Sequence, residues 1–220
     1  MAQLQFSRDE AIKFGWQAAM DNLGFFIRAL IIIFVVSLTF SVIGKLTEKS
    51  YPFISLAANI IYTFFSLMFG IGLIKIYLKI FDSQEPELSD LTFGMNLNLF
   101  LSYLVVSLLY TLIIIGGLIL FIFPGIYWAI QFQFCTYLVI DKGMGPVEAL
   151  KKSSALTKGV KWDLFVLGIL LLLIILLGIL ALFIGLFVAI PLTMMAVTFV
   201  YRKLLSQSET AQNATAAQAQ

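Results

Sequence analysis

The chain has 220 residues, of which 61% are hydrophobic and only 12% are charged, with a formal net charge of +2. Its apolar runs exceed the roughly 18 residues of a membrane helix, so the composition excludes an ordinary soluble protein and predicts a polytopic membrane protein. A single cysteine, Cys135, excludes an intrachain disulfide and a thiolate metal cluster, and the lack of histidine removes the commonest general base and metal ligand. We expect no catalytic residue, no cofactor and no metal site.

The first predicted element is a surface helix that begins near Ser7 and ends near Asp21. Ser7 and Glu10 have the S-x-x-E spacing of a capping box. Apolar side chains share one arc of this helix and charged side chains lie opposite, which is typical of a helix along the lipid headgroups with Trp16 at the polar boundary. The alternative is a cytoplasmic helix packed on the protein's own underside.

Two membrane spans are predicted next, over residues 23–43 and 53–81, joined by a short polar loop. Arg28 lies about one turn inside the first span. We expect its side chain to reach the headgroups, the alternative being a buried functional charge. A second short surface helix is predicted over residues 88–96.

A charge-free run extends from Leu91 to Ile140, which is too long for one helix and about right for two. We expect the chain to reverse at Pro124 and Gly125, because proline ends the helical ladder before it and glycine permits the reversal. The two spans are then residues 97–122 and 126–140.

A basic surface helix is predicted to follow, with Gly145 and Pro146 at its start and Gly159 at its end. One half of this helix is charged, and the other half is small and hydroxylic, which suits close packing on other helices. Its cations either bind anionic lipid headgroups or serve only as the charge that fixes orientation. These candidate headgroup contacts are Lys151, Lys152, Lys158 and Lys161.

The last apolar region predicts a fifth span over residues 162–183 and a sixth over 186–203, with a break near Gly185. The alternative is one long helix to Ile190, broken by Pro191, which would move the C-terminus to the other side. Residues 206–220 carry too little apolar surface to order themselves, so a disordered tail is predicted.

These elements predict an all-α membrane protein with a single transmembrane domain over residues 1–205. Its six helices would form three hairpins, each preceded by a cytoplasmic amphipathic helix. The near copies EAIK at residues 10–13 and EALK at 148–151, and the alignment of Gly117 with Gly178, support three repeated units. Most lysines and arginines then fall on one side, so the positive-inside rule places both ends in the cytoplasm.

Three polar residues interrupt or end the fourth predicted span: Gln131, Gln133 and Asp141. For the glutamines we favour hydrogen bonds between helices over a substrate path, because no charge lies near midspan. Asp141 is interpreted as a solvated anchor or as the partner of a nearby lysine, with a proton-relay carboxylate as the alternative.

The stretch FPGIY at residues 123–127, followed by LVIDKGMGPVEALKKSSALTKG at 138–159, resembles a large group of bacterial multi-pass membrane proteins. That group includes the membrane domain attached to glycerophosphoryl diester phosphodiesterases. The resemblance implies a six-helix protein of the bacterial cytoplasmic membrane without established activity, and the phosphodiesterase barrel is not in this sequence. The matching positions are Pro124, Gly125, Asp141, Gly145, Glu148, Ala149, Ser153 and Lys158.

The function expected is therefore a non-enzymatic, membrane-embedded interaction or lipid-environment component of the inner membrane. The alternative is a carrier or channel for a small apolar or amphiphilic solute. A lipid-modifying enzyme would need a cluster of acids, for which only Asp141 and Asp163 are candidates. The expected partners are membrane lipids with anionic headgroups and either a membrane protein or a second copy of the chain, but not nucleic acid.

Overall fold

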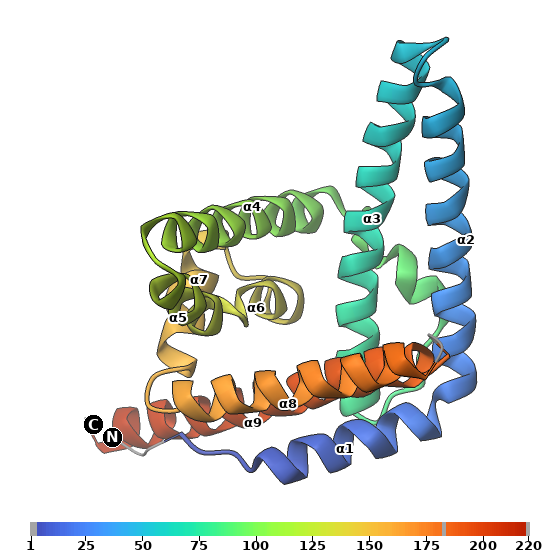
Figure 1. The fold of residues 1–220 in the computed structure, drawn as a ribbon. Coiled ribbons are helices and arrows are strands. Elements are labelled where there is room, and N and C mark those ends of the chain that lie inside the picture. The colour runs from blue at the N-terminus through green and yellow to red at the C-terminus, as the bar shows by residue number, and fades with distance from the viewer. Residues whose placement is uncertain (1–3, 182–183, 219–220) are drawn as a thin grey trace.

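The computed structural model describes residues 4–181 and 184–218, and in these ranges the chain forms helices and turns without any strand (Figure 1). Five of the helices described are long and apolar enough to cross a membrane. The elements in chain order are α1 Arg8–Asp21, α2 Leu23–Thr47, α3 Pro52–Phe81, the 3-10 helix η1 Leu88–Met95, α4 Leu97–Leu120, α5 Ile122–Phe132, α6 Cys135–Lys142, α7 Pro146–Leu156, α8 Lys161–Leu180 and α9 Leu186–Gln218.

Helices α2 and α3 pack side by side and extend away from the rest of the molecule to a short polar turn (Figure 1). Pro52 occupies the first turn of α3, where its missing N–H costs nothing. The other end of α3 returns to the main body, where Lys79 Nζ lies 2.6 Å from an oxygen of Asp90 on η1. The surface helix predicted near residues 88–96 is thus a 3-10 helix packed on α3.

Helix α1 lies along α9 and buries a face of small residues against it. The Ser7 hydroxyl accepts a hydrogen bond from the Glu10 N–H at 3.3 Å, as the capping pattern predicts. A Cβ added at Gly15 would lie 2.5 Å from the Leu192 carbonyl oxygen, so this contact needs glycine. Trp16 is 51% exposed, so α1 combines packing on the protein with an outward aromatic side chain.

The reversal between α4 and α5 occurs at Phe121, earlier than predicted. Phe121 is extended, with φ −165° and ψ 157°, and α5 begins at the next residue. Pro124 and Gly125 therefore lie inside the first turns of α5 and not at the turn itself. Proline is tolerated there because the first N–H groups of a helix have no partner within the helix. Gly125 instead packs on Gly117 of α4.

The single helix predicted over residues 126–140 is wrong, because the chain forms two helices, α5 and α6, with a break at Gln133 and Phe134. Helix α6 ends at Gly143, whose φ of 64° is the left-handed conformation that glycine adopts at no cost. Gly145 and Pro146 then start α7, as predicted. The helix ends at Leu156, and Gly159, with φ 90°, lies in the turn before α8.

The last two long helices, α8 and α9, are separate and pack side by side. Helix α9 continues through Pro191 and, in contrast to the disordered tail predicted from Ser206, stays helical to Gln218. Partners on other elements hold this end: Lys142 is 3.0 Å from Glu209, and Lys152 donates to Ser208. The predicted end of the fifth span at residue 183, and the last two residues of the tail, lie outside the described residues.

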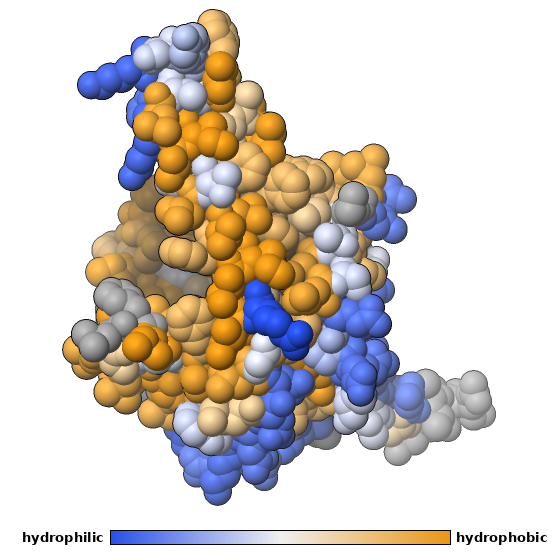
Figure 2. Space-filling view, turned by 90° about the vertical axis from the view of Figure 1, so that its right-hand side faces the viewer, coloured by the Kyte–Doolittle hydropathy of each residue, from blue (hydrophilic) through white to orange (hydrophobic). Residues whose placement is uncertain are grey.

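The exterior of the molecule is largely apolar. In Figure 2 hydrophobic side chains cover the middle of the face shown, whereas hydrophilic side chains gather at the bottom and at the far tip. Large apolar side chains are most exposed near the turns between the long helices, as at Phe53, Phe123 and Leu180. A soluble monomer rarely exposes such continuous apolar surface, so this exterior is that of a protein surrounded by lipid.

Candidate functional site

Side chains of α7 hydrogen-bond to the backbone at the break between α5 and α6. The buried Ser153 hydroxyl accepts from the Phe134 N–H at 3.2 Å and donates to the Gln131 carbonyl at 3.0 Å. The Thr157 hydroxyl donates to the same carbonyl at 3.2 Å. A break in a helix at membrane depth leaves backbone groups that lipid cannot satisfy, so these two hydroxyls make the break possible.

Gln131 is the centre of this contact. Its side-chain amide donates to Ser154 Oγ at 2.8 Å, and its side-chain oxygen accepts from Lys161 Nζ at 2.6 Å. The same Lys161 Nζ lies 3.7 Å from the centroid of the Tyr127 ring, a cation–π distance. Gln131 therefore joins α5, α7 and the start of α8, which is the helix-to-helix role predicted for it. The same role was predicted for Gln133, but among the described residues its side-chain amide donates only to the nearby Ile130 carbonyl.

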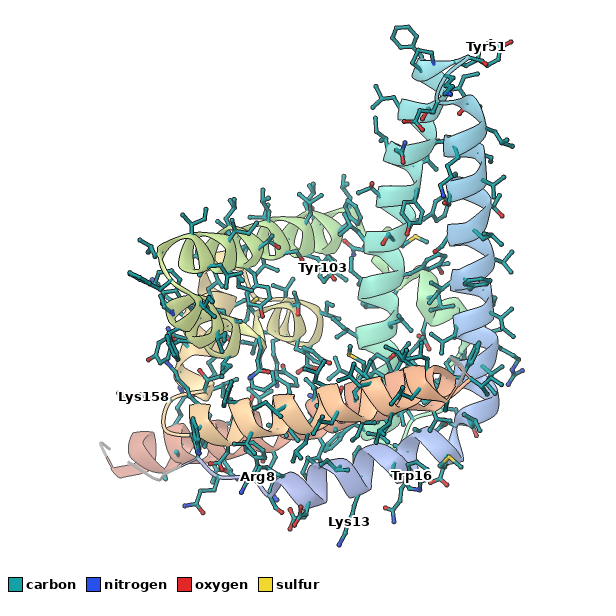
Figure 3. All side chains as sticks on the ribbon, viewed as in Figure 1. Arg8, Lys13, Trp16, Tyr51, Tyr103 and Lys158 are labelled. Carbon is teal, nitrogen blue, oxygen red and sulfur yellow. The ribbon has the colours of Figure 1, made fainter. Side chains whose placement is uncertain are left out.

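The four lysines predicted to contact headgroups divide into two pairs. Lys161 is turned inward to Gln131, and Lys152 donates to Ser208 and Gln212 of α9. Lys151 and Lys158 are exposed, and no residue within 4–181 or 184–218 forms an ion pair or a side-chain hydrogen bond with either. Figure 3 shows Lys158 at the edge of the molecule, near the junction of α7 and α8. Of these four lysines, only Lys151 and Lys158 have side chains that are free to bind a ligand.

Asp141 lies in an ionic network that joins three helices. Its carboxylate accepts from Arg202 Nη1 and from Tyr201 Oη, both at 2.9 Å, and Arg202 also pairs with Asp82 at the end of α3. The Asp141 and Arg202 side chains are only 12% and 17% exposed. Asp141 is thus the partner of an arginine on α9 and not of a nearby lysine. The arrangement ties the ends of α3 and α6 to α9.

The two acids considered for lipid-modifying chemistry lie in different ion pairs. Asp141 faces Arg202, whereas Asp163 at the start of α8 lies 4.0 Å from Arg8 Nε. Tyr110 on α4 donates its hydroxyl proton to the Ala129 carbonyl of α5 at 3.0 Å. These polar groups hold helices together.

An apolar groove of about 660 Å³ runs along the surface between α1 and α8, and its floor lies where α8 and α9 meet. Lys13, Trp16 and Gln17 of α1 form one wall, and Figure 3 shows the Lys13 side chain extending outward from that helix. The floor is made of small residues, which explains its depth. They are Gly178, Ala181, Gly185 and Ala189.

Residues 110–208 match a protein family of unknown function, DUF975. This stretch runs from α4 to α9 and includes the α5–α6 break, α7 and the pair of Asp141 with Arg202. No curated protein and no solved structure matches the chain. The match shows no link to the membrane domain of glycerophosphoryl diester phosphodiesterases. With the five apolar helices, it supports an integral membrane protein of unknown activity.

Two groupings were not predicted from the sequence. Ser153 and Thr157 belong to the small, hydroxylic face predicted for packing, but that pattern does not identify the backbone groups that they bind. The pairing of Asp141 with Arg202 was not predicted either. A signal existed for the first grouping, because hydroxyls one turn apart on one helix face can bond to a neighbouring backbone.

Proposed function

We propose that this protein is a non-enzymatic, multi-pass component of the bacterial cytoplasmic membrane that binds anionic lipid headgroups through α7. The observation that carries the proposal is a pair of exposed lysines, Lys151 on α7 and Lys158 in the turn that follows it. This segment is fixed to the rest of the protein by the hydroxyls of Ser153 and Thr157. A fixed helix presents its cations without losing much conformational freedom on binding. Each lysine near an anionic membrane surface contributes about 1 kcal/mol.

The proposed topology places both ends of the chain in the cytoplasm, with an even number of crossings. The proximity of the two ends supports an even number of crossings: the Gln5 N–H donates to Gln207 Oε1 at 2.9 Å, and Glu10 pairs with Lys203. The polar turn with Lys45 and Lys49 lies at the far end of α2 and α3 (Figure 1). This separation agrees with a cytoplasmic excess of cations.

A distant kinship with the membrane domain attached to glycerophosphoryl diester phosphodiesterases belongs to the same proposal. Its support is the sequence resemblance over residues 114–170, in which Pro124 and Gly125 fall in the first turns of α5 and Ser153 faces the α5–α6 break. That kinship is also the basis for a bacterial inner-membrane location. A carrier or channel is less favoured, because the polar groups of Gln131 and Tyr110 are used in bonds between helices.

The headgroup contact can be tested with Trp162, which is 73% exposed at the start of α8, close in sequence to Lys158. Trp16 and Trp128 are replaced by phenylalanine, so that Trp162 is the only tryptophan. The protein is reconstituted in vesicles that contain phosphatidylcholine and either brominated phosphatidylglycerol or brominated phosphatidylcholine. We expect stronger quenching of Trp162 fluorescence by the anionic lipid.

Replacing both Lys151 and Lys158 with glutamine should reduce the preference for phosphatidylglycerol by about 30-fold, since about 1 kcal/mol per lysine, or roughly 2 kcal/mol for the pair, is lost. The matched control replaces Lys45 and Lys49 at the far turn, which are also exposed. That control should leave the preference at Trp162 unchanged. Equal quenching by the two lipids in the parent, or an unchanged preference in the α7 variant, would refute the proposal.

A further inference from the structure

We propose that the groove between α1 and α8 binds one anionic phospholipid, with its headgroup at Lys13 and one acyl chain on the floor where α8 and α9 meet. The inference rests on the proposed membrane location, but it concerns a different site from α7. An experiment can therefore refute lipid binding at one site without refuting it at the other.

The shape of the groove follows from the close approach of α8 and α9. A Cβ added at Gly185 would lie 2.7 Å from Gly178 Cα, so the two helix backbones touch at this point. The residues that permit such contact have almost no side chain, and Ala181 and Ala189 beside them are also small. The surface above them is therefore hollowed. Its volume of about 660 Å³ is in the usual range of small-molecule sites, roughly 300–1,000 Å³.

The polarity of the groove changes from one side to the other. Ile174, Leu177 and Val188 line it with aliphatic side chains from α8 and α9. The polar groups come from α1, where Lys13 and Gln17 lie one helical turn apart. A ligand that fits must be apolar along most of its length and polar at one end. Such a ligand is an amphiphile, and the membrane supplies amphiphiles at high concentration.

The charge at the polar end selects an anion. Lys13 is exposed, and no carboxylate within 4–181 or 184–218 lies within ion-pair distance of it. Of the two acids one turn before it, Asp9 is exposed and Glu10 pairs with Lys203 of α9. A phosphate would provide the partner that Lys13 lacks. Trp16, which lines the same groove, is an aromatic residue of the type that lies at headgroup level.

The test uses Trp16 as the reporter, because it lines the groove. Trp128 and Trp162 are replaced by phenylalanine in the full-length chain, which is purified in detergent. Phosphatidylglycerol brominated on its acyl chains is then titrated, with brominated phosphatidylcholine as the neutral comparison. We expect saturable quenching of Trp16 fluorescence with tighter binding of phosphatidylglycerol, and native mass spectrometry should show one retained lipid.

Two variants test the contact with the headgroup and the contact with the acyl chain separately. Lys13→Gln should weaken binding of phosphatidylglycerol about fivefold and leave phosphatidylcholine unchanged. Val188→Phe, which fills the groove, should weaken binding of both lipids. The matched controls are Lys49→Gln, an exposed lysine at the far turn and outside both proposed lipid sites, and Ile169→Phe, an exposed position on α8 that does not line the groove. Both controls should bind as the parent does.

Several outcomes would overturn the inference. Quenching that rises linearly without saturation would mean that Trp16 meets only the ordinary lipid around the protein. An unchanged affinity of Lys13→Gln for phosphatidylglycerol would refute the contact between Lys13 and the headgroup. A dimer that excludes lipid from Trp16 would assign the groove to a second copy of the chain. If Lys49→Gln weakened the quenching of Trp16 as much as Lys13→Gln, the effect would be one of general surface charge. Equal quenching of Trp162 by the two lipids in the parent, with Trp16 still selective for phosphatidylglycerol, would refute the α7 proposal and leave this one standing.

Discussion

Two neighbouring glycines in α4 give a sharp test of the contact between α4 and α5. Gly116 and Gly117 share one helix and one local sequence, but they face different surroundings. A Cβ added at Gly116 would meet nothing within 4 Å. A Cβ added at Gly117 would lie 2.8 Å from both Gly125 Cα and Trp128 Cε3. Replacing each glycine with alanine therefore isolates packing from helix propensity.

The magnitude follows from two opposing effects. Alanine is favoured over glycine in a helix interior by about 1 kcal/mol, and this gain applies to both positions. At Gly117 the new carbon would be about 0.7 Å inside the normal carbon–carbon contact of roughly 3.5 Å. Overpacking of this kind costs about 1–3 kcal/mol. We expect Gly116→Ala to be more stable than the parent, and Gly117→Ala to be less stable than Gly116→Ala by about 1–3 kcal/mol.

The assay is reversible unfolding by sodium dodecyl sulfate in mixed micelles, followed by circular dichroism on the two variants and the parent. The comparison between the variants is the informative quantity, because the difference in helix propensity between glycine and alanine is common to both. If Gly117→Ala gained as much stability as Gly116→Ala, the close approach of α4 and α5 would be refuted. The placement of the first turns of α5, in which Gly125 contacts Gly117 of α4, would then be wrong.

Two further substitutions test the polar contacts by the same unfolding assay. Ser153→Ala leaves the buried Phe134 N–H without its acceptor, so we expect a loss of about 1–3 kcal/mol. A loss smaller than that of Ser154→Ala, which removes only a side-chain contact, would contradict the role of Ser153. Asp141→Asn removes one of the two carboxylates that pair with Arg202. We expect the free energy of unfolding to fall by less than the roughly 3–5 kcal/mol lost when a fully buried pair is broken, because the Asp141 and Arg202 side chains are 12% and 17% exposed. Unchanged stability would show that the pair is solvated.

The positions of the first long helices follow from local sequence. The spans predicted over residues 23–43, 53–81 and 97–122 correspond to α2, α3 and α4, whose ends differ from them by a few residues. Local residues mark these ends: Pro52 begins α3, and Asn96 caps α4 through its side chain. Such signals need no knowledge of the rest of the chain.

The reversal after α4 shows where a local rule becomes ambiguous. Proline is excluded from a helix interior but accepted in its first turn, so Pro124 is compatible with a turn and with the start of a helix. The turn is what was predicted from the sequence. The structure has the helix start, and Gly125 serves the close contact with Gly117 instead of the reversal.

The break between α5 and α6 has no local signal at all. Residues 126–142 contain neither proline nor glycine, and hydropathy continues across Gln133 and Phe134. The backbone can leave the helix there because Ser153 and Thr157, about 20 residues later, accept and donate the freed hydrogen bonds. The pairing of Asp141 with Arg202 is of the same kind, since the partners are 61 residues apart. Patterns within one segment do not report such partners.

The packing of α1 on α9 limits how α8 and α9 can lie in the membrane. Hydropathy gives α9 an apolar stretch long enough to cross. However, α1 carries exposed charged side chains, such as Asp9 and Lys13. It also lies along α9, from Lys203 past Leu192 to the turn at Gly185. Charged side chains are costly at the bilayer centre, so this part of α9 has to share the depth of a headgroup-level helix. We infer that α8 and α9 are strongly tilted and lie shallow, since an upright crossing would carry α1 into the hydrocarbon.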